Sequence, residues 1–167
     1  MAGRYLFDTL AHVGATSIGE PGSRLFYLIV GRDDGWVRMW LEKEQLRALG
    51  DGLDALLRQV GGGGRARDAN AAPPPDAPMV GEFRVVRMAV GYDEVQGLVV
   101  FTAHDESDTD DSPTLVGRFT REQAAHLAAQ AIDVCEAGRP LCAMCGEPID
   151  PDGHFCPRAN GHHPTGL

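Results

Sequence analysis

Arg118-Phe-Thr-Arg-Glu-Gln-Ala-Ala-His-Leu127 echoes an earlier stretch of the chain, Trp40-Leu-Glu-Lys-Glu-Gln-Leu-Arg-Ala-Leu49. In both stretches a strand-like run passes into a helical run through the same Glu-Gln step. Thr120 and Gln123 have the spacing of a capping box, in which each side chain accepts a hydrogen bond from the backbone N–H of the other residue. The echo predicts two halves, each a β-meander followed by a helix, and suggests an internal duplication. A shared capping pattern explains the echo almost as well as common ancestry does.

Each echo leads into a predicted helix. The first is expected over Lys43–Val60, where leucines recur at helical spacing and form one apolar stripe. The second is expected from Arg121 to about Ala137 and carries a stripe of alanine, leucine and isoleucine. Gly50 and Gly52 weaken the first helix, since glycine costs about 1 kcal/mol in a helix interior. They mark either a break or a place where the helix lies close to the sheet.

The runs before each helix read as strands separated by turns. Strands are predicted at Arg4–Phe7, Val13–Ile18, Leu25–Val30 and Trp36–Leu41, and then at Val80–Val90, Leu98–Ala103 and Thr114–Phe119. Leu25–Val30 is continuously apolar, which predicts a central strand that is buried on both faces. The fold class is therefore α+β. The halves are residues 1–60 and 80–138, joined by a Gly/Pro-rich linker over residues 61–79 that we expect to carry no site.

We interpret two further groups of residues, one aromatic and one acidic, as structural and not as binding sites. Trp36 and Trp40 share one strand face with Arg38 and offer an aromatic surface for a ligand, but aromatic residues in strands are most often core residues. Residues 104–112 form an acidic loop that we interpret as a solvated surface loop. It lacks the central glycine and the terminal glutamate of an EF-hand calcium loop.

Composition excludes several classes of partner. The formal net charge of −9 argues against binding to nucleic acid or to an anionic membrane, because both need many lysines and arginines. No stretch reaches the roughly 18 apolar residues of a membrane span. Asp8 and His12 interrupt the N-terminal apolar run before a secretory signal can form. We therefore expect a soluble, cytoplasmic protein, in which clustered cysteines are more often metal ligands than disulfides.

The tail, residues 139–167, carries the one strong chemical signal. Cys142 and Cys145 form a Cys-x2-Cys knuckle, and Cys156 follows about ten residues later. Spacing alone does not identify the fourth ligand, because the tail contains three candidate histidines: His154, His162 and His163. Three thiolates and one imidazole fill a zinc tetrahedron and leave no position for a substrate, so we predict a structural Zn2+ in a zinc-ribbon-like tail.

Cys135 is the remaining cysteine. It lies on the apolar stripe of the second predicted helix, which favours a core position over a nucleophile. Iron–sulfur ligation by all four cysteines is a weaker alternative, since histidines adjoin the tail cysteines. No nucleophile elbow, P-loop or dinucleotide fingerprint is present. The sequence therefore predicts no catalytic residue and no cofactor-binding residue apart from the metal ligands.

Several stretches together resemble a known family. They are Gly19–Leu28, Leu41–Gln45, Glu82–Arg84, Thr120–Ala137, and above all Gly138–Gly161 with its Cys-x2-Cys-Gly and His-x-Cys-Pro-Arg motifs. By these motifs the chain resembles domain-of-unknown-function family 3090, a bacterial family with no established activity. The resemblance implies the ligand set Cys142, Cys145, His154 and Cys156, since the position of His162 is often aromatic in the family. The His162-His163 ending departs from that pattern and keeps His162 as the alternative.

We expect a zinc-stabilised, non-enzymatic protein-interaction or regulatory module with an unidentified protein partner. One alternative is an enzyme of hydrolase or phosphoryl-transfer type that uses a groove in the β-rich core. A second is a nucleic-acid-binding zinc-ribbon protein. The local charge argues against nucleic-acid binding, because the acidic residues of the tail, Glu147, Asp150 and Asp152, outnumber its arginines, Arg139 and Arg158.

Overall fold

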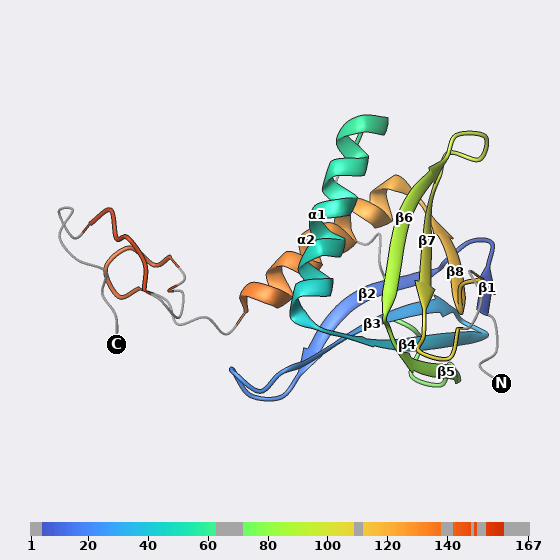
Figure 1. Cartoon of the computed structure of the whole chain (residues 1–167), viewed down its shortest axis with the longest axis horizontal. Coiled ribbons are helices and arrows are strands. Elements are labelled where there is room, and N and C mark those ends of the chain that lie inside the picture. The colour runs from blue at the N-terminus through green and yellow to red at the C-terminus, as the bar shows by residue number, and fades with distance from the viewer. Residues whose placement is uncertain are drawn as a thin grey trace.

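The computed structural model describes residues 5–62, 72–108, 112–137, 142–147, 149 and 153–158. These residues form an α+β fold with two helices and two four-stranded sheets (Figure 1). The elements are β1 (Tyr5–Phe7), β2 (His12–Ile18), β3 (Leu25–Arg32), β4 (Gly35–Leu41), α1 (Lys43–Val60), β5 (Met79–Arg84), β6 (Arg87–Asp93), β7 (Leu98–His104), β8 (Leu115–Phe119) and α2 (Arg121–Glu136). Within the described ranges, neither helix is long and apolar enough to cross a membrane.

The two sheets are built by an exchange of strands. Their orders are β1-β8-β7-β6 and β2-β3-β4-β5. In each sheet three consecutive strands form an antiparallel meander, either β2-β3-β4 or β6-β7-β8. The fourth strand comes from the other half, because β1 pairs in parallel with β8 and β5 pairs in parallel with β4. Each half thus has the order short strand, meander, helix, and the short strand of each half pairs within the sheet of the other half.

The prediction of one continuous strand over Val80–Val90 is wrong, because the chain passes from one sheet to the other within it. The N–H of Val85 donates to the carbonyl of Trp40 at 2.8 Å, in the sheet of β4 and β5. The N–H of the next residue, Val86, donates to His104 at 2.9 Å, in the sheet of β6 and β7. Consecutive amides therefore bond to different sheets, and the crossing needs no glycine or proline.

The prediction that β3 is buried on both faces is also wrong. Burial alternates along it, with Leu28 and Val30 buried and the intervening residues partly exposed. The outer face of this sheet carries the aromatic cluster of β3 and β4, so these aromatics are not core residues. The guanidinium carbon of Arg38 lies 5.3–5.7 Å from the ring centroids of Tyr27, Trp36 and Trp40. Cation–π attraction thus holds Arg38 within this cluster.

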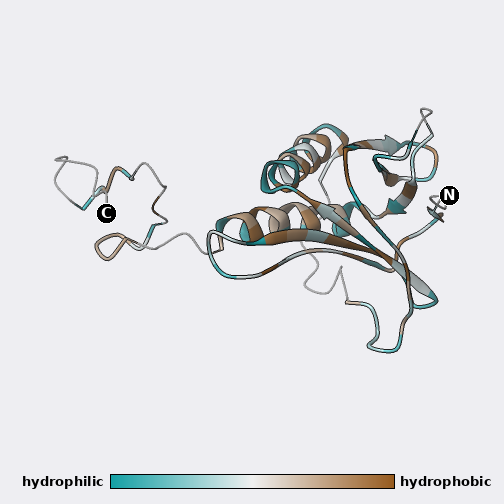
Figure 2. Ribbon diagram, turned by 60° about the horizontal axis from the view of Figure 1, so that its bottom comes forward, coloured by the Kyte–Doolittle hydropathy of each residue, from teal (hydrophilic) through white to brown (hydrophobic). Residues whose placement is uncertain are grey.

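One hydrophobic core joins both halves. Its largest fully buried side chains come from both sheets and both helices: Phe101, Phe119, Leu28, Met39, Leu46, Leu53, Leu115 and Leu127. Figure 2 shows the corresponding alternation of apolar and polar segments along the helices and strands. The expected apolar stripe of α1 is confirmed, since Leu46, Leu49, Leu53 and Leu57 are buried. The core is what fixes the two helices beside the sheets.

Glycines set the spacing of α1 on two sides. A Cβ on Gly50 would lie 3.2 Å from the carbonyl oxygen of Ala128 in α2, so Gly50 allows the two helices to approach closely. The expected contact of this glycine with the sheet is wrong; its neighbour is the other helix. Gly52 does face a sheet, because the nearest atom to a Cβ there would be Cγ2 of Val90 in β6, at 3.8 Å.

Both helices begin with a capping box. The predicted box of Thr120 and Gln123 is confirmed, and Glu42 and Gln45 form the same arrangement at α1. Each glutamine also reaches across to the other half of the chain. Gln123 donates from its side-chain amide to the carbonyl of Leu10 at 3.0 Å, and Gln45 donates to the carbonyl of Val85 at 3.2 Å.

Candidate metal centre

The first arm of the tail is a tight loop over residues 142–147. The N–H of Gly146 donates to the carbonyl of Cys142 at 2.8 Å, and the N–H of Cys142 donates to the carbonyl of Glu147 at 2.8 Å. Gly146 has a φ of +76°, which a residue with a side chain adopts only with strain. The loop turns the side chains of Cys142 and Cys145 towards a common point. The sequence pattern Cys-x2-Cys-Gly predicted this turn.

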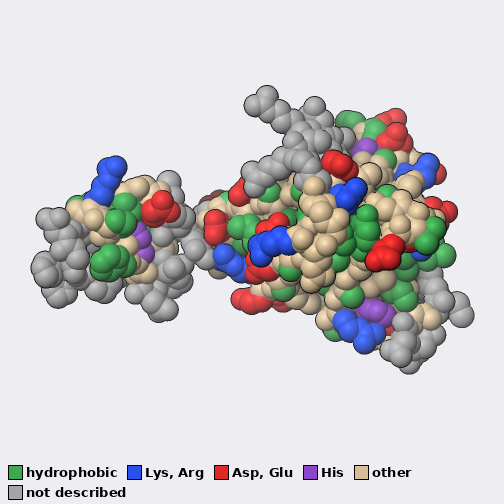
Figure 3. Space-filling view, turned by 90° about the horizontal axis from the view of Figure 1, so that it is seen from above, with side chains coloured by type: hydrophobic (Ala, Val, Ile, Leu, Met, Phe, Trp, Pro, Cys, Tyr) green, Lys and Arg blue, Asp and Glu red, His purple; other side chains and the backbone are tan. Residues whose placement is uncertain are grey.

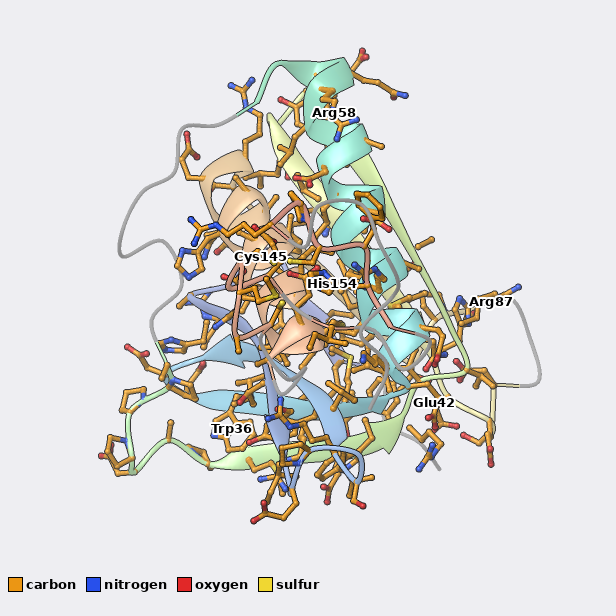
Figure 4. The ribbon with its side chains drawn as sticks, turned by 90° about the vertical axis from the view of Figure 1, so that its left-hand side faces the viewer. Trp36, Glu42, Arg58, Arg87, Cys145 and His154 are labelled. Carbon is orange, nitrogen blue, oxygen red and sulfur yellow. The ribbon has the colours of Figure 1, made fainter. Side chains whose placement is uncertain are left out.

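The second arm brings His154 and Cys156 to the same point. Cys142 Sγ lies 3.8 Å from Cys156 Sγ, and Cys145 Sγ lies 3.6 Å from His154 Nε2. The four ligand atoms all lie within 4.8 Å of one another, so together they could hold a metal ion. Figure 4 shows Cys145 and His154 next to each other. Cys142 and Cys156 are buried, and the other two ligands are partly exposed.

One contact between the arms is not evident from the sequence. Arg158 donates from its guanidinium to the carbonyl of Met144 at 3.1 Å, and so connects the residues after Cys156 with the first loop. The sequence alone shows Arg158 only as a positive charge. A hydrogen bond between an exposed arginine and a backbone carbonyl leaves no local sequence signal that could have shown it.

The electrostatics of the arms favour a metal-binding thiolate. Hydrogen bonds from the backbone of Cys145 and then of Met144, together with the His154 side chain, lower the pKa of Cys142 to about 6. Burial raises the pKa of Cys145, and the neighbouring sulfurs add to this effect. Hydrogen bonding therefore favours the thiolate form of Cys142, whereas burial favours the thiol form of Cys145. A bound divalent metal ion would favour the thiolate form of both, because thiols bind metals in their deprotonated form.

The remaining sequence-predicted candidates lie elsewhere. His162 and His163 lie outside the described residues, as do Pro148 and residues 150–152 between the two arms. Cys135 is 2% exposed in α2, and burial raises its pKa, which confirms its interpretation as a core residue. Its sulfur approaches the carbonyl of Lys43 at 3.6 Å. Among the described residues, the grouped metal-ligand candidates are the four of the tail.

The acidic loop is organised around Asp108 in its described part. The carboxylate of Asp108 accepts hydrogen bonds from the Thr114 hydroxyl at 2.7 Å and from the N–H groups of Thr114 and Asp105 at 3.1 and 3.2 Å. The hydroxyl bond is the main cause of a lowered pKa at Asp108. Asp108 therefore closes a surface loop, which agrees with the structural interpretation of the acidic run. Residues 109–111 lie outside the described part.

Comparison with known proteins gives a family and no named relative. A search of curated proteins and a search of solved structures each found no match. One family model, described as a protein of unknown function (DUF3090), matches residues 5–156. The match covers all ten helices and strands of the described residues and ends at Cys156, the last of the four clustered candidate ligands. The chain therefore belongs to the DUF3090 family.

Proposed function

We propose that this protein is a zinc-stabilised, non-enzymatic protein-interaction module. The observation that carries the proposal is the closed Cys3His set of Cys142, Cys145, His154 and Cys156. Four protein ligands complete a tetrahedron, which is the arrangement of structural zinc sites, whereas catalytic sites keep one position open. The metal's role is to fold a tail that is too short to build a core of its own.

The ligand spacing supports zinc as the metal. Zinc binds sulfur at about 2.3 Å and nitrogen at about 2.0–2.1 Å in a tetrahedron. Such a tetrahedron places two sulfurs about 3.8 Å apart and a sulfur and a nitrogen about 3.6 Å apart. These values match the 3.8 Å between Cys142 and Cys156 and the 3.6 Å between Cys145 and His154. Thiolate and imidazole ligands also exclude magnesium and calcium, which prefer oxygen.

Apolar side chains on the tail support an interaction role. Phe155, between two of the ligands, is 74% exposed, and Met144, beside Cys145, is 48% exposed. Figure 3 shows apolar side chains beside a histidine on the tail surface. Phe and Met are among the residues that interface cores favour. On the face seen in Figure 3, acidic and basic side chains alternate without one large positive area, which argues against a nucleic-acid partner.

Two further parts of the proposal concern origin and location. We propose that the two halves arose by duplication; the matched element order and the reciprocal glutamine contacts support this. We place the protein in the cytoplasm, because a zinc site with three thiolates requires reduced cysteines.

Affinity purification of tagged protein from its native cells tests the interaction role. We expect a stoichiometric partner to co-purify with the wild type and to be lost with Phe155→Ser and with Cys156→Ser. Val95→Ser is the matched control, because Val95 is 97% exposed on the hairpin between β6 and β7, outside the tail. Retention of the partner by Phe155→Ser and Cys156→Ser would contradict the proposal. So would purification without a partner together with turnover in a hydrolase or phosphoryl-transfer screen.

A further inference from the structure

The edge strand β6 directs half of its backbone groups away from the sheet. In the sheet β1-β8-β7-β6, the carbonyls of Thr114 and Arg118 accept hydrogen bonds from the β1 side of β8. Backbone groups of successive residues in a strand point to opposite sides, so every second residue between these two directs its N–H and C=O towards β7. The register of the β8–β7 and β7–β6 pairs then fixes which residues of β6 direct their backbone groups towards β7 and which direct them away from the sheet. It follows that the N–H groups of Met88, Val90 and Tyr92 face the outer edge of the sheet, where no described strand pairs with β6.

The other half of the molecule closes the equivalent edge with a side chain. Ala15 is the fourth residue of edge strand β2, as Val90 is of β6. The N–H of Ala15 donates to Oε1 of Gln130 in α2 at 2.9 Å. A glutamine side chain ends in a carboxamide, which has the hydrogen-bonding chemistry of a peptide group. Gln130 therefore occupies this edge as the carbonyl of an added strand would.

At β6 the corresponding helix position is a glycine. Gln130 is the tenth residue of α2, and Gly52 is the tenth residue of α1. Without a side chain at Gly52, a groove of about 370 Å³ opens between α1 and β6. Leu49, Val86, Met88 and Val90 supply much of its apolar lining. Figure 1 shows α1 running beside β6. The residues that line the groove belong to these two elements, apart from Val86 just before β6.

The charge at the groove indicates the chemistry of its occupant. Among the described residues that line it, Arg87 alone is charged. The Arg87 guanidinium lies 3.4–3.5 Å from the ring nitrogens of His104, and Figure 4 shows its side chain pointing outward from the beginning of β6. A carboxylate on the occupant would complement this guanidinium.

We propose that the groove between α1 and β6 binds an extended peptide of a partner protein by strand addition, with a peptide carbonyl on the Val90 N–H and a carboxylate near Arg87. Main-chain hydrogen bonds to a sheet edge and side-chain pockets beside it are a recurring mode of peptide recognition. Because α1 lies beside this edge, we expect it to obstruct the sheet edge of a second copy, which carries its own α1, more than a single extended peptide. The inference rests on the proposed interaction function and adds to it a peptide-binding surface on the core.

The test uses the full chain and a phage-displayed library of random dodecapeptides. Enriched peptides are synthesised, and their affinities for the wild type, Gly52→Gln and Gly52→Ala are measured by fluorescence anisotropy. Gly52→Gln installs the side chain that closes the β2 edge. The nearest atom to a new Cβ lies at 3.8 Å, an ordinary contact, so both variants are expected to fold. Gly52→Ala controls for the change of helix propensity.

We expect enrichment of peptides with alternating apolar residues and a carboxylate. Their binding should weaken at least about tenfold in Gly52→Gln, stay within about twofold in Gly52→Ala, and weaken in Arg87→Gln. In nuclear magnetic resonance spectra, the Val90 amide should shift on binding. Absence of enrichment, or binding that tolerates Gly52→Gln, would overturn the proposal. A dimer that Gly52→Gln abolishes would overturn it in favour of a second copy.

The result of the peptide-binding test can be distinguished from the result of a test of the zinc module. Peptide binding in the core should persist in Cys156→Ser, whose tail has lost a ligand. A wild-type chain that binds peptide but no metal would refute the zinc module alone, and one that binds metal but no peptide would refute the groove alone.

Discussion

The side-chain amide of Gln123 donates a hydrogen bond to the carbonyl of Leu10, at 3.0 Å and across 113 positions of the chain. The same glutamine caps its own helix, because its Oε1 accepts from the N–H of Thr120 at 2.9 Å. One buried carboxamide therefore fixes the start of α2 and the end of the segment that follows β1. Gln45 does the same for α1 and Val85. These paired contacts hold the exchanged strands in place.

Replacing the two glutamines should cost unequal amounts of stability. Gln123 is 8% exposed, so Gln123→Ala leaves the Leu10 carbonyl without this donor in a buried place. We expect a loss of about 2 kcal/mol in the free energy of unfolding. Gln45 is partly exposed, and water can replace it, so Gln45→Ala should cost about 1 kcal/mol or less. Urea denaturation measures both, and a larger loss for Gln45→Ala would contradict the assignment.

Alanine at the two glycines of α1 should change stability in opposite directions. Gly52→Ala gains helix propensity, with only an ordinary contact to Val90 at 3.8 Å, and should stabilise the protein by about 0.5–1 kcal/mol. Gly50→Ala places a methyl group 3.1 Å from Ile132 Cδ1 and 3.2 Å from the Ala128 carbonyl, so α1 and α2 must separate. We expect net destabilisation of about 1–3 kcal/mol. Thermal denaturation of both variants checks the signs, and stabilisation by Gly50→Ala would show that the helices are not in close contact there.

The Asp108 loop should give a defined pH dependence. The pKa of Asp108 is lowered from its ordinary value of 3.8, chiefly by the hydrogen bond from Thr114. A lowered pKa in the folded state means that the carboxylate stabilises the fold above pH 3.8 and loses this effect as the pH falls through the folded-state value. Wild type should therefore exceed Asp108→Asn in melting temperature at pH 7, and the difference should shrink below pH 3.8. A pH-independent difference would contradict this account.

Local patterns predicted the helices and most strands well. The Glu-Gln capping step and the leucine spacing placed α1 at Lys43–Val60, where the structure has it. Local patterns could not show the strand exchange, because β1 and β5 pair with partners on the other half. They also missed the crossing at Val85 and Val86, where both residues are strand formers and only their hydrogen-bond partners differ.

The candidate site was more predictable than the fold around it. Cys-x2-Cys-Gly is a local loop whose ligand geometry follows from a few residues, and the structure brings Cys142, Cys145 and Cys156 together. Spacing alone left three histidines as candidates for the fourth ligand; among the described residues, His154 is the histidine that lies beside the cysteines. The β6 groove had no sequence signal, because it depends on Gly52 and Val90 meeting across 38 positions.

Amide exchange should distinguish the two sheet edges in the free protein. The Ala15 N–H is bonded to Gln130, whereas the Val90 N–H faces the open groove. We expect the Ala15 amide to exchange more slowly than the Val90 amide, and Gly52→Gln to slow exchange at Val90. Hydrogen–deuterium exchange followed by nuclear magnetic resonance gives both rates. Slow exchange at Val90 in the wild type would mean that its edge is already closed.

The most direct test of the zinc-module account is native mass spectrometry of the full chain, with His154→Ala and His162→Ala as a matched pair. We predict one zinc ion per chain in the wild type and in His162→Ala. His154→Ala should lose most of the zinc, because it removes one of four ligands. A metal-free wild type with the same tail conformation, or zinc kept by His154→Ala and lost by His162→Ala, would contradict the assignment of Cys142, Cys145, His154 and Cys156.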